Sequence, residues 1–451
     1  MKRNIFLTIA IAFTSVTFAQ TETFNDFGIL LSKDKKYGTA RYEAMSGAFG
    51  ALGSDVSSIS VNPAGAVVAI KSKFSVTLNN RSTNLTTSYY GANNEFRDNF
   101  FNISQAGGIL SFTGNNSDEW TRFAFSFNYK LNNDFNNFYA LGGNNNLAPT
   151  YNEHFNDNKV NRTQFNTPVE QYADLITEGE TSTFSVGVSA VHQNKLFIGA
   201  NLNFHNLEYY RDYLFNEINN DADGNTLDVR NRIISQTTGE GFSLSLGFIY
   251  KANQNLRLGL AYESPTWYQQ IIEDSEDLLT MNGIESLDLN PYRDNQGPFL
   301  DEYRFRTPSR ITASGAYIFG KKGLLSVDYT YRDYQNAKFR GTGFNDVNTN
   351  FSNNYRNTHA LNIGTEWKFD RMSVRGGYHY EKDPNLLAGG NTNEDNVRGY
   401  SLGLGYNFGK VIIDLGYTKY NNTEFYSLYR TGDINILNNT SRISGTVTFG
   451  L

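Results

Sequence analysis

The chain has 451 residues, with 39 lysines and arginines against 45 aspartates and glutamates and a formal net charge of −6. Charged residues make up only 19% and aromatic residues 15% of the chain, whereas a soluble globular protein carries about 25% charged residues. The absence of cysteine excludes a disulfide scaffold, a zinc–thiolate site and a cysteine nucleophile. The acidic balance, with no basic run, excludes nucleic acid as a partner.

The first 19 residues have the three parts of a secretory signal peptide. Lys2 and Arg3 form a basic start, residues 5–18 form an apolar stretch, and Ala19 ends a cleavage site of small residues. An apolar stretch of about 14 residues is too short for a typical transmembrane helix. The sequence therefore predicts a signal peptide at 1–19 and an exported mature chain.

Residues 20–70 show no strand alternation. Residues 37–53 are rich in glycine and alanine, which allow close backbone packing and irregular turns. The run Asn62, Pro63, Ala64, Gly65 is typical of a turn or a helix start. A compact segment ahead of the first strand would most simply fill the interior of a barrel. We therefore predict a hatch (plug) over 20–70 and a barrel over 71–451.

From about residue 72 onward, apolar and polar residues alternate over runs of eight to twelve residues, as in strands that are apolar on one face. In one run, Phe123, Phe125 and Phe127 share one face while Ala124 and Ser126 share the other. The pattern predicts about fourteen strands, at 72–80, 106–113, 121–131, 182–191, 195–209, 239–251, 255–263, 309–319, 323–333, 357–369, 371–381, 398–408, 410–420 and 440–450.

The connections alternate between short turns, such as 192–194 and 320–322, and long polar loops, such as 132–181 and 264–308. Short periplasmic turns and long extracellular loops are typical of outer-membrane barrels, whereas a soluble β-sandwich would not segregate its long loops to one end. The sequence therefore predicts an all-β fold: a 14-stranded antiparallel transmembrane β-barrel of the bacterial outer membrane, surrounded by outer-membrane lipid.

The run Asn62 to Gly65 follows Ser54-Asp55 and stands just ahead of the fourteen-strand pattern. In this position it resembles the hatch motif of the FadL family, outer-membrane transporters of long-chain fatty acids and aromatic hydrocarbons. The resemblance implies a monomer and passive uptake of a hydrophobic small molecule, with a pocket near the hatch and lateral exit through a kink in the third strand. The predicted third strand, 121–131, contains no glycine or proline, so the sequence does not show such a kink.

Two sets of residues are candidates for ligand contact. An apolar pocket between hatch and wall would be lined by Phe49, Leu52, Ile59, Val67 and Val68. Arginines inside the lumen would hold a carboxylate head group by bidentate hydrogen bonds or, alternatively, pair with lumen acids and support the hatch. The candidate arginines are Arg41, Arg257 and Arg375.

Two further motifs are weak indications of other chemistry. Ser401 lies in a Gly-x-Ser-x-Gly pattern, but a hydrolase elbow requires a strand–turn–helix context and this serine lies within an alternating strand. Asn219, Asp221, Asp223 and Asp228 resemble the start of a calcium loop that lacks the final bidentate glutamate, which favours a solvated turn. The sequence predicts no enzyme, no catalytic residue, no cofactor and no metal.

Two alternative functions remain open for such a barrel. A FadL-like barrel could act in protein secretion by binding a secreted substrate through its long loops at 132–181 and 264–308. A general porin would conduct ions through an open lumen, which a closed hatch would prevent.

Overall fold

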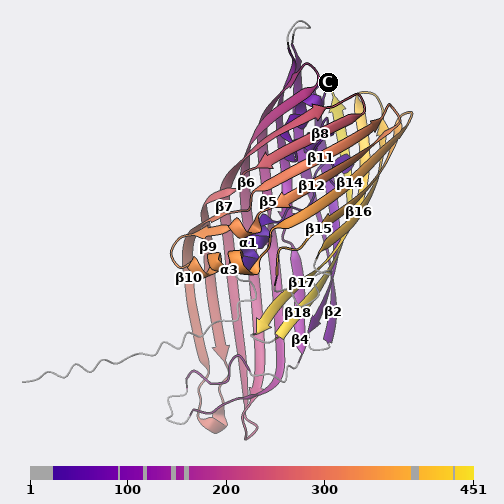
Figure 1. Ribbon diagram of the computed structural model, residues 1–451. Coiled ribbons are helices and arrows are strands. Elements are labelled where there is room, and N and C mark those ends of the chain that lie inside the picture. Colours follow the sequence, from indigo (N-terminus) through magenta and orange to yellow (C-terminus); the bar gives the residue numbers. More distant parts are fainter. Residues whose placement is uncertain are drawn as a thin grey trace, which may run out of the picture.

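The computed structural model describes residues 24–89, 92–114, 119–143, 149–156, 162–386, 396–429 and 432–451, so the predicted signal peptide lies outside the described residues. Within them, strand segments form one antiparallel sheet (Figure 1). It closes through the pairing of β1 (Lys73–Tyr89) with β18 (Gly432–Gly450). No helix of this part of the chain is long and apolar enough to cross a membrane.

The other strand segments follow in chain order. They are β2 (Ala92–Thr113), β3 (Trp120–Asp134), β4 (Asn137–Gly143), β5 (Thr167–His192), β6 (Leu196–Asn220), β7 (Thr226–Lys251), β8 (Leu256–Glu263), β9 (Trp267–Met281), β10 (Tyr292–Arg306), β11 (Arg310–Phe319), β12 (Gly323–Arg332), β13 (Lys338–Arg340), β14 (Thr358–Phe369), β15 (Met372–Glu381), β16 (Val397–Asn407) and β17 (Val411–Tyr429).

The eighteen described segments make up fourteen strands, because four strands are interrupted. β3 and β4 both pair with β5 and form the third strand. β8 and β9 both pair with β7 and form one strand. β10 and β11 form the next strand, which pairs with β9 and β8. β12 and β13 form the strand after it, which pairs with β11 and β10. The predicted 14-stranded antiparallel barrel is confirmed.

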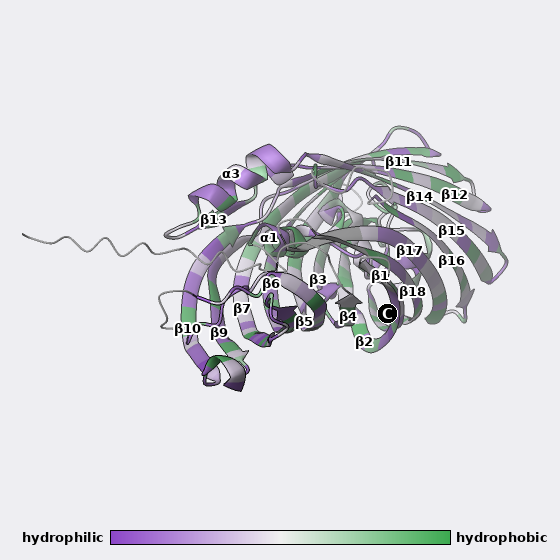
Figure 2. Cartoon of the chain, turned by 90° about the horizontal axis from the view of Figure 1, so that it is seen from below, coloured by the Kyte–Doolittle hydropathy of each residue, from purple (hydrophilic) through white to green (hydrophobic). Residues whose placement is uncertain are grey.

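The outer face of the wall is apolar at the level of the short turns. Side chains such as Phe184, Val188 and Leu244 are exposed, whereas their neighbours Ser185 and Ser243 are buried toward the lumen. Figure 2 shows this alternation of hydrophobic and hydrophilic residues along the strands. Because the strands of this band are joined by ladders into a closed sheet and its outer face is apolar, the band fits the hydrocarbon core of a membrane.

The prediction of long polar loops is wrong for much of the chain, because several strands continue beyond the membrane. β5, β6 and β7 have 26, 25 and 26 residues, whereas about 9–11 residues suffice to span a bilayer. In Figure 1 they extend far from the end that carries the C-terminus. Outside the membrane the outer face needs no apolar residues, so the alternation that marks a strand in the sequence disappears.

Short helices precede β1 and pack against the lumen face of the wall. They are α1 (Phe24–Ser32), α2 (Ala40–Ala44) and the 3-10 helices η1 (Val56–Ser60) and η2 (Pro63–Val68). α2 contacts β15 to β18, and η2 contacts β3 and β5 to β7. α1 packs against α3 (Asn345–Asn354), which follows β13. The other short helices are η3 (Glu285–Leu287) and η4 (Tyr334–Asn336).

Candidate functional site

Asn62 joins two turns of the hatch to the wall. Its Oδ1 accepts a hydrogen bond from the backbone N–H of Ala64 (3.1 Å) and so caps η2, which begins at Pro63. Its Nδ2 donates to the backbone oxygens of Gly50 (2.7 Å) in the hatch and Phe248 (3.1 Å) in β7. The sequence motif around Asn62 therefore holds the hatch against the barrel wall.

Wall glycines let the hatch backbone approach closely. A Cβ atom at Gly199 would lie 2.5 Å from the carbonyl carbon of Pro63, and one at Gly259 would lie 2.5 Å from the backbone oxygen of Gly50. Contacts this short leave no room for a side chain. A Cβ atom would also lie within 3 Å of a hatch atom, in the backbone or a side chain, at the wall glycines Gly247, Gly364, Gly377, Gly403 and Gly416. The hatch therefore packs closely against the wall on both sides of the lumen.

We expect Asn62→Ala to lower the free energy of unfolding by about 1–3 kcal/mol, because it removes the cap of η2 and leaves buried backbone groups without partners. Denaturant unfolding of the detergent-solubilised barrel would measure the change. Ser60→Ala is the control, since the Ser60 hydroxyl donates to the backbone oxygen of Ser57 (2.7 Å) in its own helix and bonds to no described residue of the wall. Equal stability of the two variants would contradict this role of Asn62.

The residues predicted to line an apolar pocket are tightly packed. Phe49 and Leu52 lie in one buried cluster with β11, while Ile59, Val67 and Val68 lie in or against another with β2, β3 and β5 to β7. Within the described part of the chain, none of the five lines either of the two cavities described below. They form the interface between hatch and wall, and their contact with a ligand stays a prediction.

The predicted arginine anchors also lie between hatch and wall. Arg41 of α2 donates to both carboxylate oxygens of Glu366 in β14 (2.7 and 3.2 Å). Arg375 of β15 donates to Glu366 (2.7 Å) and to Asp414 of β17 (2.7 Å). Arg257 donates to a hatch carbonyl oxygen (3.0 Å). Each guanidinium thus binds an oxygen of the protein, and a role in holding a ligand carboxylate stays a prediction.

A cavity of about 260 Å³ lies between α1, the linker at 33–39 and the wall. Its lining combines apolar and charged side chains, which suits a molecule with an apolar body and a polar end. The apolar part includes Ile29, Leu30, Leu85, Phe135, Leu175, Tyr209 and Ile436, and the charged part includes Lys36, His379, Glu381 and Arg442.

Lys36 differs from the neighbouring lysines of this cavity in its burial and its ion pairing. It is 7% exposed, and in the described part of the chain it forms no ion pair, whereas Lys33 and Lys35 lie 3.5 and 3.6 Å from carboxylate oxygens. Burial lowers the pKa of Lys36 to about 8, and the nearby Asp34 and Glu381 offset part of this effect. The carboxylates of Asp34 and Glu381 also line this cavity but lie beyond ion-pair distance of Lys36 in the described part of the chain. Burial of an ammonium group without a directly bound carboxylate is costly, so a ligand carboxylate would be a favourable partner.

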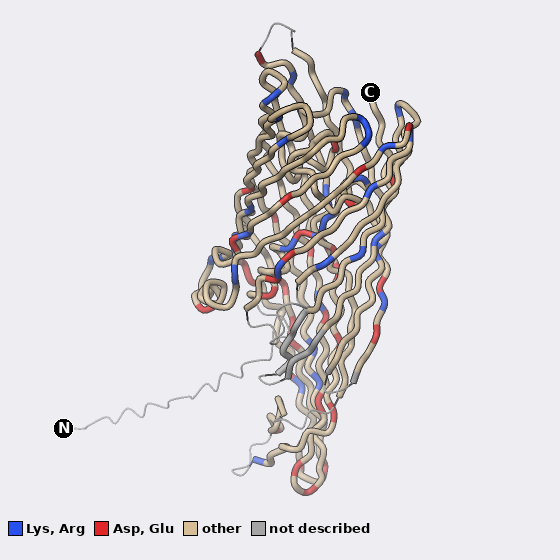
Figure 3. The backbone as a smooth tube through the Cα atoms, turned by 45° about the vertical axis from the view of Figure 1, so that its right-hand side comes forward, with Lys and Arg blue, Asp and Glu red and all other residues tan. Residues whose placement is uncertain are grey.

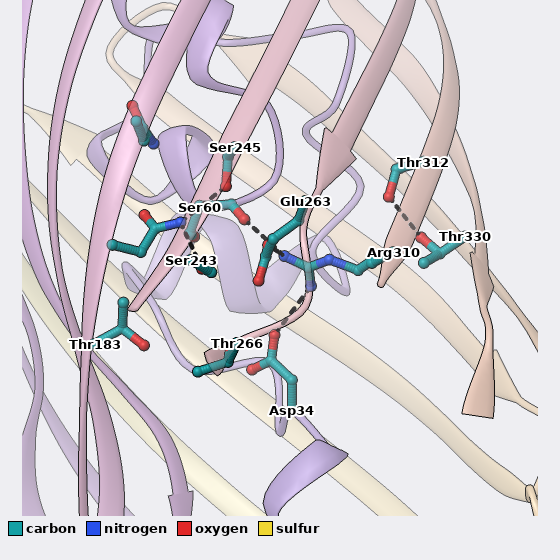
Figure 4. Close-up of polar contacts among 12 residues, drawn as sticks. Asp34, Ser60, Thr183, Ser243, Ser245, Glu263, Thr266, Arg310, Thr312 and Thr330 are labelled. Carbon is teal, nitrogen blue, oxygen red and sulfur yellow. Dashed lines mark hydrogen bonds and ion pairs between the residues drawn. The ribbon is translucent and has the colours of Figure 1, made fainter. Parts of the chain in front are cut away.

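A smaller polar cavity of about 80 Å³ lies on the other side of the linker, around Asp34 (Figure 4). Asp34 accepts from Lys130 of β3 (2.9 Å) and Arg310 of β11 (3.2 Å), and Arg310 also binds Glu263 and the backbone oxygen of Ser60. Burial opposes ionisation of Asp34, but the surrounding cations outweigh it and hold its pKa well below the usual range. These contacts fix the linker two residues before Lys36.

The second and third strands separate beside the larger cavity. Their ladder runs from Thr113↔Arg122 only as far as Gln105↔Lys130. At this point β2 has a bulge at Ser104, where its pairing with β1 skips one residue. Beyond Ser104, the described residues contain no ladder between β2 and the third strand. The hydrogen-bonded ladder of the wall is therefore interrupted on the extracellular side of Ser104, and Phe96 of β2 and Phe138 of β4 pack across the interruption with ring centres 5.3 Å apart. We call this interruption of the ladder the gap.

The third strand bends toward the lumen below this gap. Backbone oxygens of Asn136 and Ala140 accept from the β1 side chains of Arg81 (2.9 Å) and Thr87 (3.2 Å), so this strand contacts β1 as well as β2. Gly179 of β5 lies opposite the interruption with φ +105°, a conformation that other residues rarely adopt. The third strand is thus interrupted between β3 and β4, with a glycine of the neighbouring strand opposite the interruption, and a lateral exit at this place stays a prediction.

The residues of the weaker motifs have structural contacts. The Ser401 hydroxyl lies 2.9 Å from a backbone oxygen of α2 and 2.8 Å from the Ser46 hydroxyl, which joins β16 to the hatch. Of the predicted calcium residues, Asp221 accepts backbone N–H groups of its own turn, and Asn219 donates to the backbone oxygen of Tyr151 (2.9 Å). The described residues contain no group of three or more side chains suited to a metal ion.

No family model and no curated protein matches the chain. Among solved structures, a Pseudomonas aeruginosa FadL homologue is similar over 93% of this chain and 99% of its own, with 16% identity and a TM-score of 0.58. The Pseudomonas putida toluene transporter TodX matches over 93% and 99%, with 16% identity and a TM-score of 0.53. The Ralstonia pickettii toluene transporter TbuX matches over 92% and 99%, with 16% identity and a TM-score of 0.55. The chain therefore has the fold of the FadL-type barrels of the bacterial outer membrane.

Proposed function

We propose that this barrel takes up a hydrophobic small molecule with a carboxylate end, such as a long-chain fatty acid, across the outer membrane. The observation that carries the proposal is the amphipathic cavity with the buried Lys36, which forms no ion pair among the described residues, beside the gap in the strand ladder. The FadL homologue and the toluene transporters of similar fold support a hydrophobic substrate. The head group would bind Lys36, and the apolar body would lie against residues such as Leu175 and Phe135.

The gap at Ser104 is the proposed exit from the cavity into the bilayer. Among the described residues, no ladder joins β2 to the third strand beyond Ser104. The side-chain oxygen and nitrogen of Asn102 and the hydroxyl of Ser104 lie at this place, buried and without a hydrogen-bond partner. The hatch favours a sideways route, because its close seat against the wall glycines blocks the straight path to the periplasm. A general porin would need that straight path to be open.

Asn102→Trp tests the exit, because an indole at this position would obstruct the gap. We expect uptake of labelled fatty acid into proteoliposomes to fall roughly tenfold, while binding to the detergent-solubilised protein stays unchanged. Asn99→Trp is the matched control, since Asn99 is exposed three residues away on the same strand. Wild-type uptake by Asn102→Trp would overturn the lateral route, whereas loss of binding in both variants would indicate misfolding.

A further inference from the structure

The rim of the barrel formed by the short turns is basic. Figure 3 shows lysines and arginines at this end, around the C-terminus. Among the described residues of the rim, the exposed acids are Glu119 and Asp370. The exposed cations are Lys71, Lys195, Lys321, Lys322, Lys368, Arg371 and Lys410. The short turns of an outer-membrane barrel face the periplasm, so this excess of positive charge lies at the periplasmic side of the membrane.

Four of these cations form one continuous surface, which we call the cationic arc: Lys321, Lys322, Arg371 and Lys410. The turns that carry them are joined by the sheet, because the backbone oxygen of Lys322 accepts from Lys368 (2.8 Å) and that of Arg371 accepts from β16 (2.9 Å). In the described part of the chain, none of the four forms an ion pair, whereas Lys368 lies 3.9 Å from Glu366. Asp370 is the acid within the arc.

A band of exposed aromatic rings follows the arc on the outer face of the wall. Phe319 and Trp367 are stacked with ring centres 5.5 Å apart, and Tyr406 and Phe408 lie 4.6 Å apart. All four rings are exposed, and Phe369 continues the band. Aromatic rings of membrane proteins prefer the level of the lipid headgroups. The band therefore places the cationic arc in the headgroup layer of the periplasmic leaflet.

We infer that the cationic arc binds phospholipids with a negatively charged headgroup, such as phosphatidylglycerol. Four cations against one acid leave an excess of positive charge, and lysine and arginine are the usual phosphate-binding side chains. The aromatic band adjoins the lipid acyl chains, so one lipid can contact both surfaces. This continuity favours a lipid over a soluble acidic partner. The inference is independent of what the barrel transports.

The full-length protein is placed in nanodiscs that contain phosphatidylcholine and a minor fraction of phosphatidylglycerol. The experiment compares the amounts of the two lipids that stay bound to the protein. After mild detergent extraction, mass spectrometry gives the ratio of the two lipids on the protein. We expect the wild type to be enriched in phosphatidylglycerol, by up to roughly fivefold per engaged cation, and the enrichment to fall in high salt. The rim variant replaces the arc by glutamine: Lys321→Gln, Lys322→Gln, Arg371→Gln and Lys410→Gln.

The control variant removes the same charge from exposed residues on β10 and β13: Arg293→Gln, Arg304→Gln, Lys338→Gln and Arg340→Gln. We expect it to keep the wild-type lipid ratio while the rim variant falls to the ratio of the bulk bilayer. A wild type at the bulk ratio, or a rim variant as enriched as the wild type, would overturn the inference. If the rim variant lacks the heat-dependent gel migration of a folded barrel, the wild type in high salt is the test instead. An enrichment in phosphatidylglycerol that does not fall in high salt would then overturn the inference.

Discussion

Glu366→Gln is expected to lower the free energy of unfolding by about 3 kcal/mol and to make the barrel conduct ions. Glu366 is 1% exposed and binds two guanidinium groups, those of Arg41 in the hatch and Arg375 in the wall. Removing its charge leaves Arg41 with the more distant Asp55 (3.7 Å) as its one ion-pair partner among the described residues. A buried cation that loses its partner is strongly destabilising. Because Arg41 belongs to the hatch and Arg375 to the wall, the loss weakens the contact between hatch and wall.

Denaturant unfolding and single-channel recordings in planar bilayers would measure the two effects of Glu366→Gln. Lys368→Gln is the matched control, because the exposed Lys368 lies 3.9 Å from the same carboxylate and a surface pair contributes at most about 1 kcal/mol. Lowered stability without conductance would show that Glu366 supports the wall rather than the hatch. A stable, closed variant would contradict the proposed role altogether.

Lys36→Met is expected to weaken the binding of a fatty acid roughly 10- to 100-fold, because it removes a hydrogen bond between charged groups and such a bond contributes about this much to affinity. Binding of the matching methyl ester should be unchanged, because the apolar wall of the cavity is retained. Fluorescence titration of the detergent-solubilised protein would measure both affinities. Lys35→Met is the control, since Lys35 already lies 3.6 Å from Asp134. An equal loss for acid and ester would mean that Lys36 shapes the cavity instead of binding the head group.

The affinity for a fatty acid should also depend on pH. Because burial lowers the pKa of Lys36 to about 8, its ammonium form predominates below pH 8 and is lost as the pH rises through that value. The ligand carboxylate is ionised above about pH 5. Affinity should therefore be highest between these limits and decline above pH 8, while Lys36→Met shows no such decline. A flat profile for the wild type would exclude Lys36 as the anchor.

The membrane-spanning part of the fold follows from local residue order. Alternation at runs such as Phe123 to Phe127 marks a strand because lipid faces one side and the lumen the other. The same reasoning fails beyond the membrane, where β5 to β7 continue as strands without apolar outer residues. Reasoning from alternation also fails at the third strand, which is interrupted before Asn137. The residue opposite this interruption is Gly179 of β5, which follows Asn137 by 42 positions in the sequence. That contact exists only once the strands are paired.

By itself, the sequence determined that fourteen strands close around a hatch whose Asn62-Pro63 turn lies ahead of them. The sequence also predicted lumen arginines as anchors for a ligand carboxylate, but it did not distinguish them from other lumen cations such as Lys36. Only the tertiary structure decided that Arg41 and Arg375 share Glu366, whereas Lys36 borders a cavity and forms no ion pair with any described residue. The reason is physical: alternation depends on which face each residue presents, whereas the pairing of a charge depends on residues brought together from distant strands.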